Sequence, residues 1–147
     1  MPRLLVPFDG SDSALRALHH GIALAMFAGD VSVHLVTVLR APPASRPLAL
    51  AERLVREAGV IHTGDVLVGE IVPTLLRRAT EIRCDAILMG SRGLGESGFA
   101  GPGRGVGGGT GGGPGGEGAP DATPRRGLGS VAAGVLDLAW VPVTLVR

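Results

Sequence analysis

Three short segments of this sequence carry residue types that could hold a polar or anionic ligand. The first is Pro7-Phe8-Asp9-Gly10-Ser11, in which a carboxylate follows a short apolar run. A carboxylate at the end of a strand can accept hydrogen bonds from a ribose hydroxyl or an adenine amine. An Asp in this place is equally a common turn former, so this segment alone does not decide between the two roles.

The other two segments are Gly90-Ser91-Arg92-Gly93 and Gly129-Ser130. Glycines let a backbone approach a phosphate closely, with N–H groups pointing at it. A helix beginning at Ser130 would add unpaired N–H groups and the positive end of its dipole. Ser130 could donate to a phosphate or cap the helix, and Arg92 could bind phosphate or stay solvated. Without further support, a turn glycine and a helix cap are the simpler interpretation.

Alternating apolar runs predict the elements that position these segments. The expected strands are Leu4–Phe8, Val31–Leu39, a third within Val60–Val68 and concentrated at Val66–Val68, Ala86–Met89 and Val141–Val146. The expected helices follow a Ser11 cap up to Gly29, then cover Leu48–Ala58 and Glu70–Arg83, and last begin at Ser130. This alternation predicts one doubly wound, Rossmann-like α/β domain over residues 1–147, with five parallel strands. In such sheets ligands bind beyond the carboxyl ends of the strands, where the strand order reverses.

A Gly-rich segment interrupts the pattern at about residues 94–126. Thirteen of the 21 residues from Gly98 to Gly118 are glycine, and no hydrophobic period is visible. Such a segment buries too little apolar surface to offset its ordering entropy, so we expect it to be disordered.

The composition excludes several classes of function. The formal net charge is +1 and only four residues are aromatic, which argues against a nucleic-acid partner. All 14 basic residues are Arg, so a P-loop lysine and lysine Schiff-base chemistry are excluded. The four His show no metal-ligand spacing, and no serine has a plausible His–Asp pair, so we expect neither a metal site nor catalytic residues.

The remaining features predict a soluble cytoplasmic protein with no membrane segment. The single cysteine, Cys84, allows no intrachain disulfide and is expected to be reduced and structural. The segment Leu128–Val146 is apolar, but Asp137 and Pro142 divide it into a helix and a strand. The N-terminal residues Met1–Asp9 do not form a signal peptide.

Several of these pieces, in this order, resemble the universal stress protein family. They are Leu4–Ser11, Ile87-Leu88-Met89-Gly90-Ser91-Arg92-Gly93, Gly129-Ser130-Val131 and the closing Val141–Arg147. The resemblance covers Met1–Gly93 and Gly127–Arg147. It implies the strand order 3-2-1-4-5 and an adenine nucleotide alpha hydrolase-like fold.

The resemblance also implies a nucleotide site. Pro7 is one of its expected residues, and Asp9 would meet the ribose or adenine end. Val38, at the end of the second strand, would hold adenine through its main chain, and Met89 and Gly90 would flank the nucleotide.

The phosphate half of the implied site comes from two segments. The family's nucleotide-binding branch carries Gly-x-x-Gly, nine residues, and then Gly-Ser or Gly-Thr. On this pattern Gly93, Gly129, Ser130 and Val131 would hold the phosphates, with Arg92 as an additional contact.

The sequence departs from that pattern by an insertion of about 26 residues, because Leu94–Leu128 replaces the nine-residue span. Four interpretations remain open: a tolerated disordered insert, a mobile lid, a partner-binding tail, or an accident of Gly-rich coding sequence. We favour the first, since the cost of closing a loop grows only slowly with its length.

The predicted function is that of a stress-response regulator that binds ATP, or AMP or ADP, with Mg²⁺ as an optional companion. We expect at most slow ATP hydrolysis, because no general base is evident. The resemblance implies a homodimer through the last strand, Val141–Val146. The alternative is a dimeric scaffold of the same fold that does not bind nucleotide, which the insertion favours.

Overall fold

The computed structural model describes residues 1–92 and 128–147, in which strands and helices alternate. The elements are β1 (Arg3–Pro7), α1 (Asp12–Ala28), β2 (Ser32–Leu39), α2 (Ala49–Glu57), β3 (His62–Val68), α3 (Ile71–Glu81), β4 (Ala86–Gly90), α4 (Ser130–Leu138) and β5 (Val143–Val146). The insertion predicted at 94–126 lies outside the described residues.

The five strands form one parallel sheet in the order β3-β2-β1-β4-β5, which confirms the predicted strand order and fold class. Leu5 of β1 pairs with His34 of β2 on one side and Ile87 of β4 on the other. The chain therefore winds outward from β1 in both directions. The order reverses between β1 and β4, and ligands of such sheets bind at this point.

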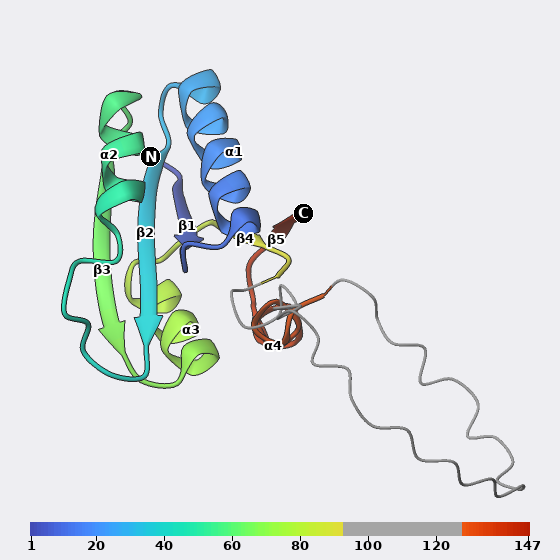
Figure 1. Cartoon of the computed structure of the whole chain (residues 1–147). Helices are drawn as coiled ribbons and strands as arrows, with labels where there is room; N and C mark the ends of the chain where they lie inside the picture. Colours follow the sequence, from blue (N-terminus) through green and yellow to red (C-terminus); the bar gives the residue numbers. More distant parts are fainter. Residues whose placement is uncertain (93–127) are drawn as a thin grey trace, which may run out of the picture.

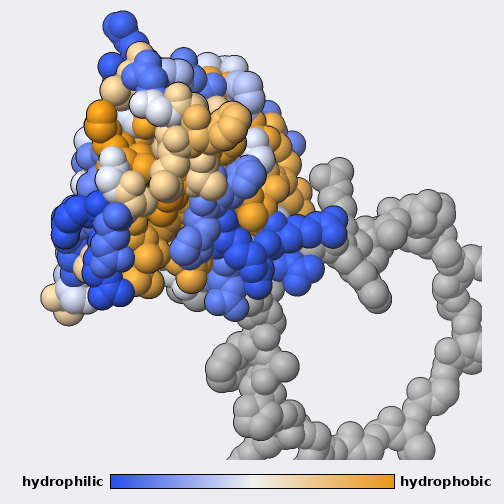
Figure 2. Space-filling view, turned by 90° about the horizontal axis from the view of Figure 1, so that it is seen from above, coloured by the Kyte–Doolittle hydropathy of each residue, from blue (hydrophilic) through white to orange (hydrophobic). Residues whose placement is uncertain are grey.

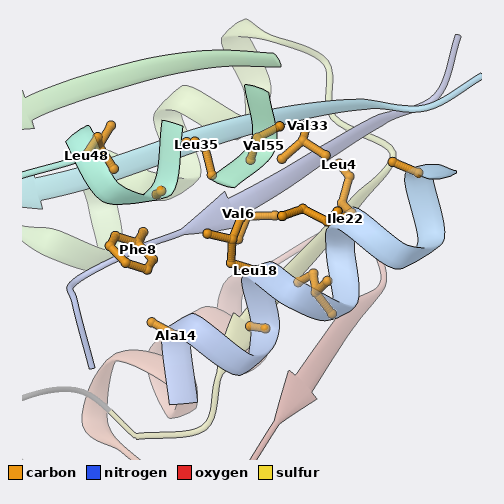
Figure 3. Packing of buried hydrophobic residues seen from close by; sticks show 14 residues of the cluster. Leu4, Val6, Phe8, Ala14, Leu18, Ile22, Val33, Leu35, Leu48 and Val55 are labelled. Carbon is orange, nitrogen blue, oxygen red and sulfur yellow. The ribbon is translucent and has the colours of Figure 1, made fainter. Parts of the chain in front are cut away.

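Helices cover both faces of the sheet (Figure 1). Alternate strand residues point to opposite faces, so Leu4 and Val6 enter one core while Leu5 enters the other. The first core packs α1 and α2 against the sheet, and Figure 3 shows Leu18 and Ile22 of α1 near Val6 and Leu4. The second core packs α3 and α4 on the opposite face. Packing in these two cores fixes the carboxyl ends of the strands relative to the helices that follow them.

The ends of α1 follow from its sequence. Ser11 caps the helix, as predicted, and its hydroxyl accepts the Ala14 N–H at 3.2 Å. Gly29 ends the helix in the left-handed conformation, at a φ of 74° that glycine adopts without steric cost.

Two sequence predictions need correction. The third strand is not concentrated at Val66–Val68 but pairs with β2 over all of His62–Val68. It pairs only with β2 within the described sheet, and as an edge strand it tolerates the polar His62, Thr63 and Asp65. The N-cap of α4 is Gly129 rather than Ser130, which is the first residue of the helix.

The predicted division of the apolar C-terminal segment is confirmed, because α4 and β5 both lie within Leu128–Val146. Across residues 1–92 and 128–147, no helix has the length and apolar character needed to cross a membrane. Cys84 is buried and forms no disulfide.

The most exposed apolar side chains lie at the amino ends of the strands. Phe27 is 94% exposed at the end of α1, and Met1 and Ile61 precede β1 and β3. Figure 2 looks onto the molecule from above the view of Figure 1 and shows an apolar area between hydrophilic ones. The carboxyl ends of the strands, where a ligand is expected, form the opposite end of the sheet.

Candidate functional site

A cleft opens at the point where the strand order reverses. It holds about 540 Å³, counting its open mouth, and its walls are mainly apolar. The walls come from the ends of β1, β2 and β4, from the first turns of α1 and α4, and from the first two turns of α3. The lining residues are Pro7, Phe8, Asp9, Ala14, Val36, Thr37, Val38, Ile71, Leu75, Met89, Gly90, Ser91, Arg92, Val131 and Ala132.

The structure brings most of the predicted site residues together in this cleft. Seven of them line it, from four separate segments of the chain: Pro7, Asp9, Val38, Met89, Gly90, Arg92 and Val131. Gly129 and Ser130 precede Val131 at the start of α4 but do not line the cleft. Gly93 lies outside the described residues.

Asp9 follows β1 and forms a turn within the cleft wall. Its Oδ1 accepts the Ser11 N–H at 2.9 Å, and the intervening Gly10 has a φ of 83°. This is the turn-forming role that the sequence left open. The same hydrogen bond fixes the carboxylate beside the cleft, so the turn and a ligand contact are compatible.

The start of α1 is hydrogen-bonded to the segment that follows β4. The hydroxyl groups of Ser11 and Ser13 both donate to the carbonyl oxygen of Arg92, at 3.3 Å for Ser11. Ser13 Oγ also accepts the Arg92 N–H at 3.3 Å. Two elements about 80 residues apart in the sequence are thereby joined at the edge of the cleft.

Gly90 has a packing role that the sequence did not reveal. A Cβ atom built on Gly90 would lie 2.7 Å from the backbone nitrogen of Ala14, in the first turn of α1. Real Cβ contacts are longer, so only glycine allows α1 to approach β4 this closely. The absent side chain therefore makes room for protein backbone.

The backbone N–H groups of Ser91 and Arg92, after β4, both donate hydrogen bonds within the protein. Ser91 N donates to Val146 O at 2.8 Å, and Gly129 N donates to Ser91 O at 2.6 Å. Arg92 N donates to Ser13. These donors hold β4, β5 and the start of α4 together, so within the described part of the chain a phosphate would have to bind other groups.

The first turn of α4 offers such groups. Gly129 is its N-cap and supplies no side-chain hydrogen bond, while Val131 and Ala132 line the cleft. The first N–H groups of a helix have no partner within the helix, and the dipole is positive at this end. The start of α4 and the Arg92 side chain are thus the candidate phosphate contacts in the cleft.

The sequence analysis did not identify two buried hydroxyl side chains that line the cleft, those of Thr37 and Ser91. For Thr37 the sequence does contain a signal, because this polar residue interrupts the apolar stretch of β2. It also missed Ile71 and Leu75, although the apolar stripe of α3 was recognised. That stripe could not be assigned to the cleft without the position of α3 relative to β2.

The described residues include no group of three or more His, Cys, Asp or Glu side chains that could hold a metal ion. Asp9 is the one carboxylate among the described residues that line the cleft. A divalent cation in this place would need oxygen ligands from a phosphate chain, as Mg²⁺ commonly has.

The sequence matches no family model and no curated protein. Solved structures with the same fold are nevertheless numerous. A universal stress protein in complex with cAMP is 26% identical with a TM-score of 0.67, over 99% of this chain and 96% of that one. A universal stress protein family protein from Arabidopsis thaliana with AMP bound is 17% identical with a TM-score of 0.65, over 99% and 91%.

A third similar structure is the universal stress protein from Archaeoglobus fulgidus in complex with dAMP. It is 22% identical with a TM-score of 0.63, over 100% of this chain and 98% of that one. The parallel sheet, its strand order and its helices agree with this group. The chain therefore has the universal stress protein fold, which confirms the resemblance that its sequence motifs indicated.

Proposed function

We propose that this protein binds an adenine nucleotide in the cleft between β1 and β4 and acts as a stress-response regulator. The observation that carries the proposal is the composition of the cleft. Apolar walls from Val38, Met89 and Leu75 suit a flat base, and one fixed carboxylate, Asp9, suits a ribose or amine. Proteins of this fold have been solved with cAMP, AMP and dAMP.

The proposed ligand is ATP or a shorter adenine nucleotide, and Mg²⁺ would enter with the phosphates. We assign no catalytic residue, so hydrolysis would be slow. Cys84 is a free, buried thiol, as expected in a reducing compartment, and we place the protein in the cytoplasm.

Calorimetry with AMP tests the proposal on the full chain. Asp9→Asn keeps the size of the side chain but removes its charge, and Asp30→Asn changes an exposed Asp outside the cleft. Losing a hydrogen bond to a charged group should weaken AMP binding by about tenfold or more in Asp9→Asn. Asp30→Asn should bind like the wild type.

The alternative, a scaffold that binds no nucleotide, is favoured by the hydrogen bonds that already engage the N–H groups of Ser91, Arg92 and Gly129. Absence of AMP and ATP binding by the full chain would support it. Binding only by a variant whose 94–126 segment is cut to the nine-residue span would show that the insertion disables the site.

We also propose a homodimer through β5. Within the described sheet β5 pairs only with β4, so one edge of Val143–Val146 is available to a second copy. Light scattering should give twice the chain mass. A monomeric mass at micromolar concentration would reject the dimer without affecting the nucleotide proposal.

A further inference from the structure

A second cleft near the first contains three arginines. It holds about 1070 Å³, counting the open space in front of it, and receives Arg16 from α1, Arg92 after β4 and Arg147 after β5. The other lining residues are Ser13, Ser91, Leu128 and Leu145. No Asp or Glu lines this cleft among residues 1–92 and 128–147, so its side-chain charge is entirely positive.

Ion pairs between described residues engage only some of the arginines in the described part of the chain. Arg46 and Arg78 form short ion pairs with Glu52 and Asp65. Among the ion pairs between described residues, none involves Arg16 or Arg147. Guanidinium groups that share one cleft repel each other, and a bound anion would turn that repulsion into attraction.

The nearest acidic residue in the sequence is Asp12, one turn before Arg16 on α1. Asp12 is exposed and does not line the cleft. It can attract Arg16 along the helix surface, but an exposed pair of this kind is worth little. The cleft therefore keeps its capacity for an anion.

The arginine cleft and the apolar cleft share the residues Ser91 and Arg92. Hydrogen bonds to Val146, Gly129 and Ser13 fix this shared border. The same bonds occupy backbone N–H groups that could otherwise have held phosphates. Among residues 1–92 and 128–147, side chains therefore supply most of the positive charge for a phosphate chain beyond the first turn of α4.

The charges of the two clefts also favour one orientation of a bound nucleotide. Asp9 places a negative charge in the apolar cleft, whereas Arg16 and Arg147 line the second cleft and Arg92 lies on the border between the two. A nucleotide is more stable with its nucleoside beside Asp9 and its phosphates toward the arginines. The planar guanidinium also matches the oxygens of a phosphate in a bidentate way.

We propose that Arg16, Arg92 and Arg147 form a subsite for the terminal phosphates of the nucleotide, so that the protein prefers a triphosphate to a monophosphate. This proposal rests on the proposed nucleotide binding. In this proposal Arg16 and Arg147 discriminate between a triphosphate and a monophosphate, because Arg92 lines both clefts and contacts either kind of ligand.

The test compares ATP and AMP by calorimetry in the full chain. The variants are Arg16→Gln, Arg147→Gln and the double variant, and the matched control is Arg53→Gln on the exposed surface of α2. The wild type should bind ATP at least about tenfold more tightly than AMP. The double variant should lose about tenfold in ATP affinity and stay within about twofold for AMP. Thermal unfolding of each variant shows that it is folded.

Inorganic tripolyphosphate separates failure of this proposal from failure of the nucleotide proposal. It should bind the wild type and Arg53→Gln but not the double variant. An unchanged ratio of ATP to AMP affinity in the double variant, with both nucleotides bound, would overturn the arginine subsite and leave nucleotide binding standing. Tripolyphosphate binding that needs the arginines, without AMP or ATP binding, would support the anion site and overturn the nucleotide proposal.

Discussion

Ser13 and Arg92 are 79 residues apart in the sequence, yet the hydroxyl of Ser13 satisfies both backbone polar groups of Arg92. It donates to the Arg92 carbonyl and accepts the Arg92 N–H at 3.3 Å. The Ser13 side chain is buried, so water does not easily replace it. This contact ties the first turn of α1 to the border between the two clefts.

Removal of the Ser13 hydroxyl should destabilise the protein. In Ser13→Ala the Arg92 N–H loses the Ser13 oxygen as an acceptor, while the Arg92 carbonyl keeps Ser11 as a donor. We expect the free energy of unfolding in urea to fall by about 1–3 kcal/mol. Ser45→Ala, in an exposed loop, should change it by no more than about 0.5 kcal/mol. Equal values for the two variants would contradict a structural role for Ser13.

The close approach of α1 to β4 makes Gly90 sensitive to a single methyl group. In Gly90→Ala the new carbon would lie 2.7 Å from the Ala14 backbone nitrogen, so the helix or the strand must move. Overpacking of this kind should lower the free energy of unfolding by about 1–3 kcal/mol.

Gly134→Ala is the comparison for this substitution. Its new carbon would lie 3.0 Å from Cγ2 of Val72, a side-chain atom that can shift. Alanine is also favoured over glycine in a helix by about 1 kcal/mol. Its stability should therefore remain close to that of the wild type. If Gly90→Ala were as stable as Gly134→Ala, the contact with α1 would not restrict residue 90.

The sequence predicted the alternation of elements because apolar periodicity survives in each of them. It placed the Asp9 and Gly90 segments at one edge of the sheet for a related reason: parallel strands bring their carboxyl ends together there. Met89 came from the family resemblance. The order of the strands came from the family resemblance, since periodicity does not state which strands are neighbours. The full length of β3 was missed because an edge strand can carry polar residues such as His62.

The hydrogen bonds of the site could not be predicted in the same way. Glycine and serine after a strand are typical of a phosphate loop and equally of close packing. Only the arrangement of α1 against β4 shows that Gly90 makes room for a backbone and that Ser13 binds Arg92. Such choices depend on contacts between residues far apart in the sequence, and local patterns carry no record of them.

His34 should make stability depend on pH. It lies in β2, with Nδ1 2.8 Å from Thr63 Oγ1 and Nε2 3.2 Å from Ser32 Oγ. Burial, followed by the charge of Arg3, lowers the pKa of His34 below its ordinary value of 6.5; Asp65 raises this pKa and Arg78 lowers it further. The folded protein then binds fewer protons than the unfolded chain, so stability present above pH 6.5 is lost as the pH falls.

Urea unfolding of the wild type and two variants at about pH 7.5, 6.5 and 5 measures this effect, because these pH values bracket the ordinary His pKa. His34→Gln should lose less stability over this range than the wild type, because its side chain does not titrate. His20→Gln, an exposed residue of α1, should follow the wild-type curve. A wild-type curve parallel to that of His34→Gln would show that His34 takes no part in the pH dependence.

Val131 offers a direct test of where the nucleotide lies. It is half-buried in the first turn of α4 and lines the apolar cleft. In Val131→Phe the ring should occupy space that the proposed nucleotide needs, so AMP binding should weaken by about tenfold or more. Because the cleft is open to solvent, the ring can enter it without displacing the core, and the free energy of unfolding should change by less than about 1 kcal/mol.

Leu136→Phe changes an exposed residue of the same helix outside the cleft and should leave AMP affinity unaltered. Equal AMP affinity in Val131→Phe and Leu136→Phe would place the nucleotide outside this cleft, since a ring at position 131 cannot avoid a ligand held between β1, β4 and α4.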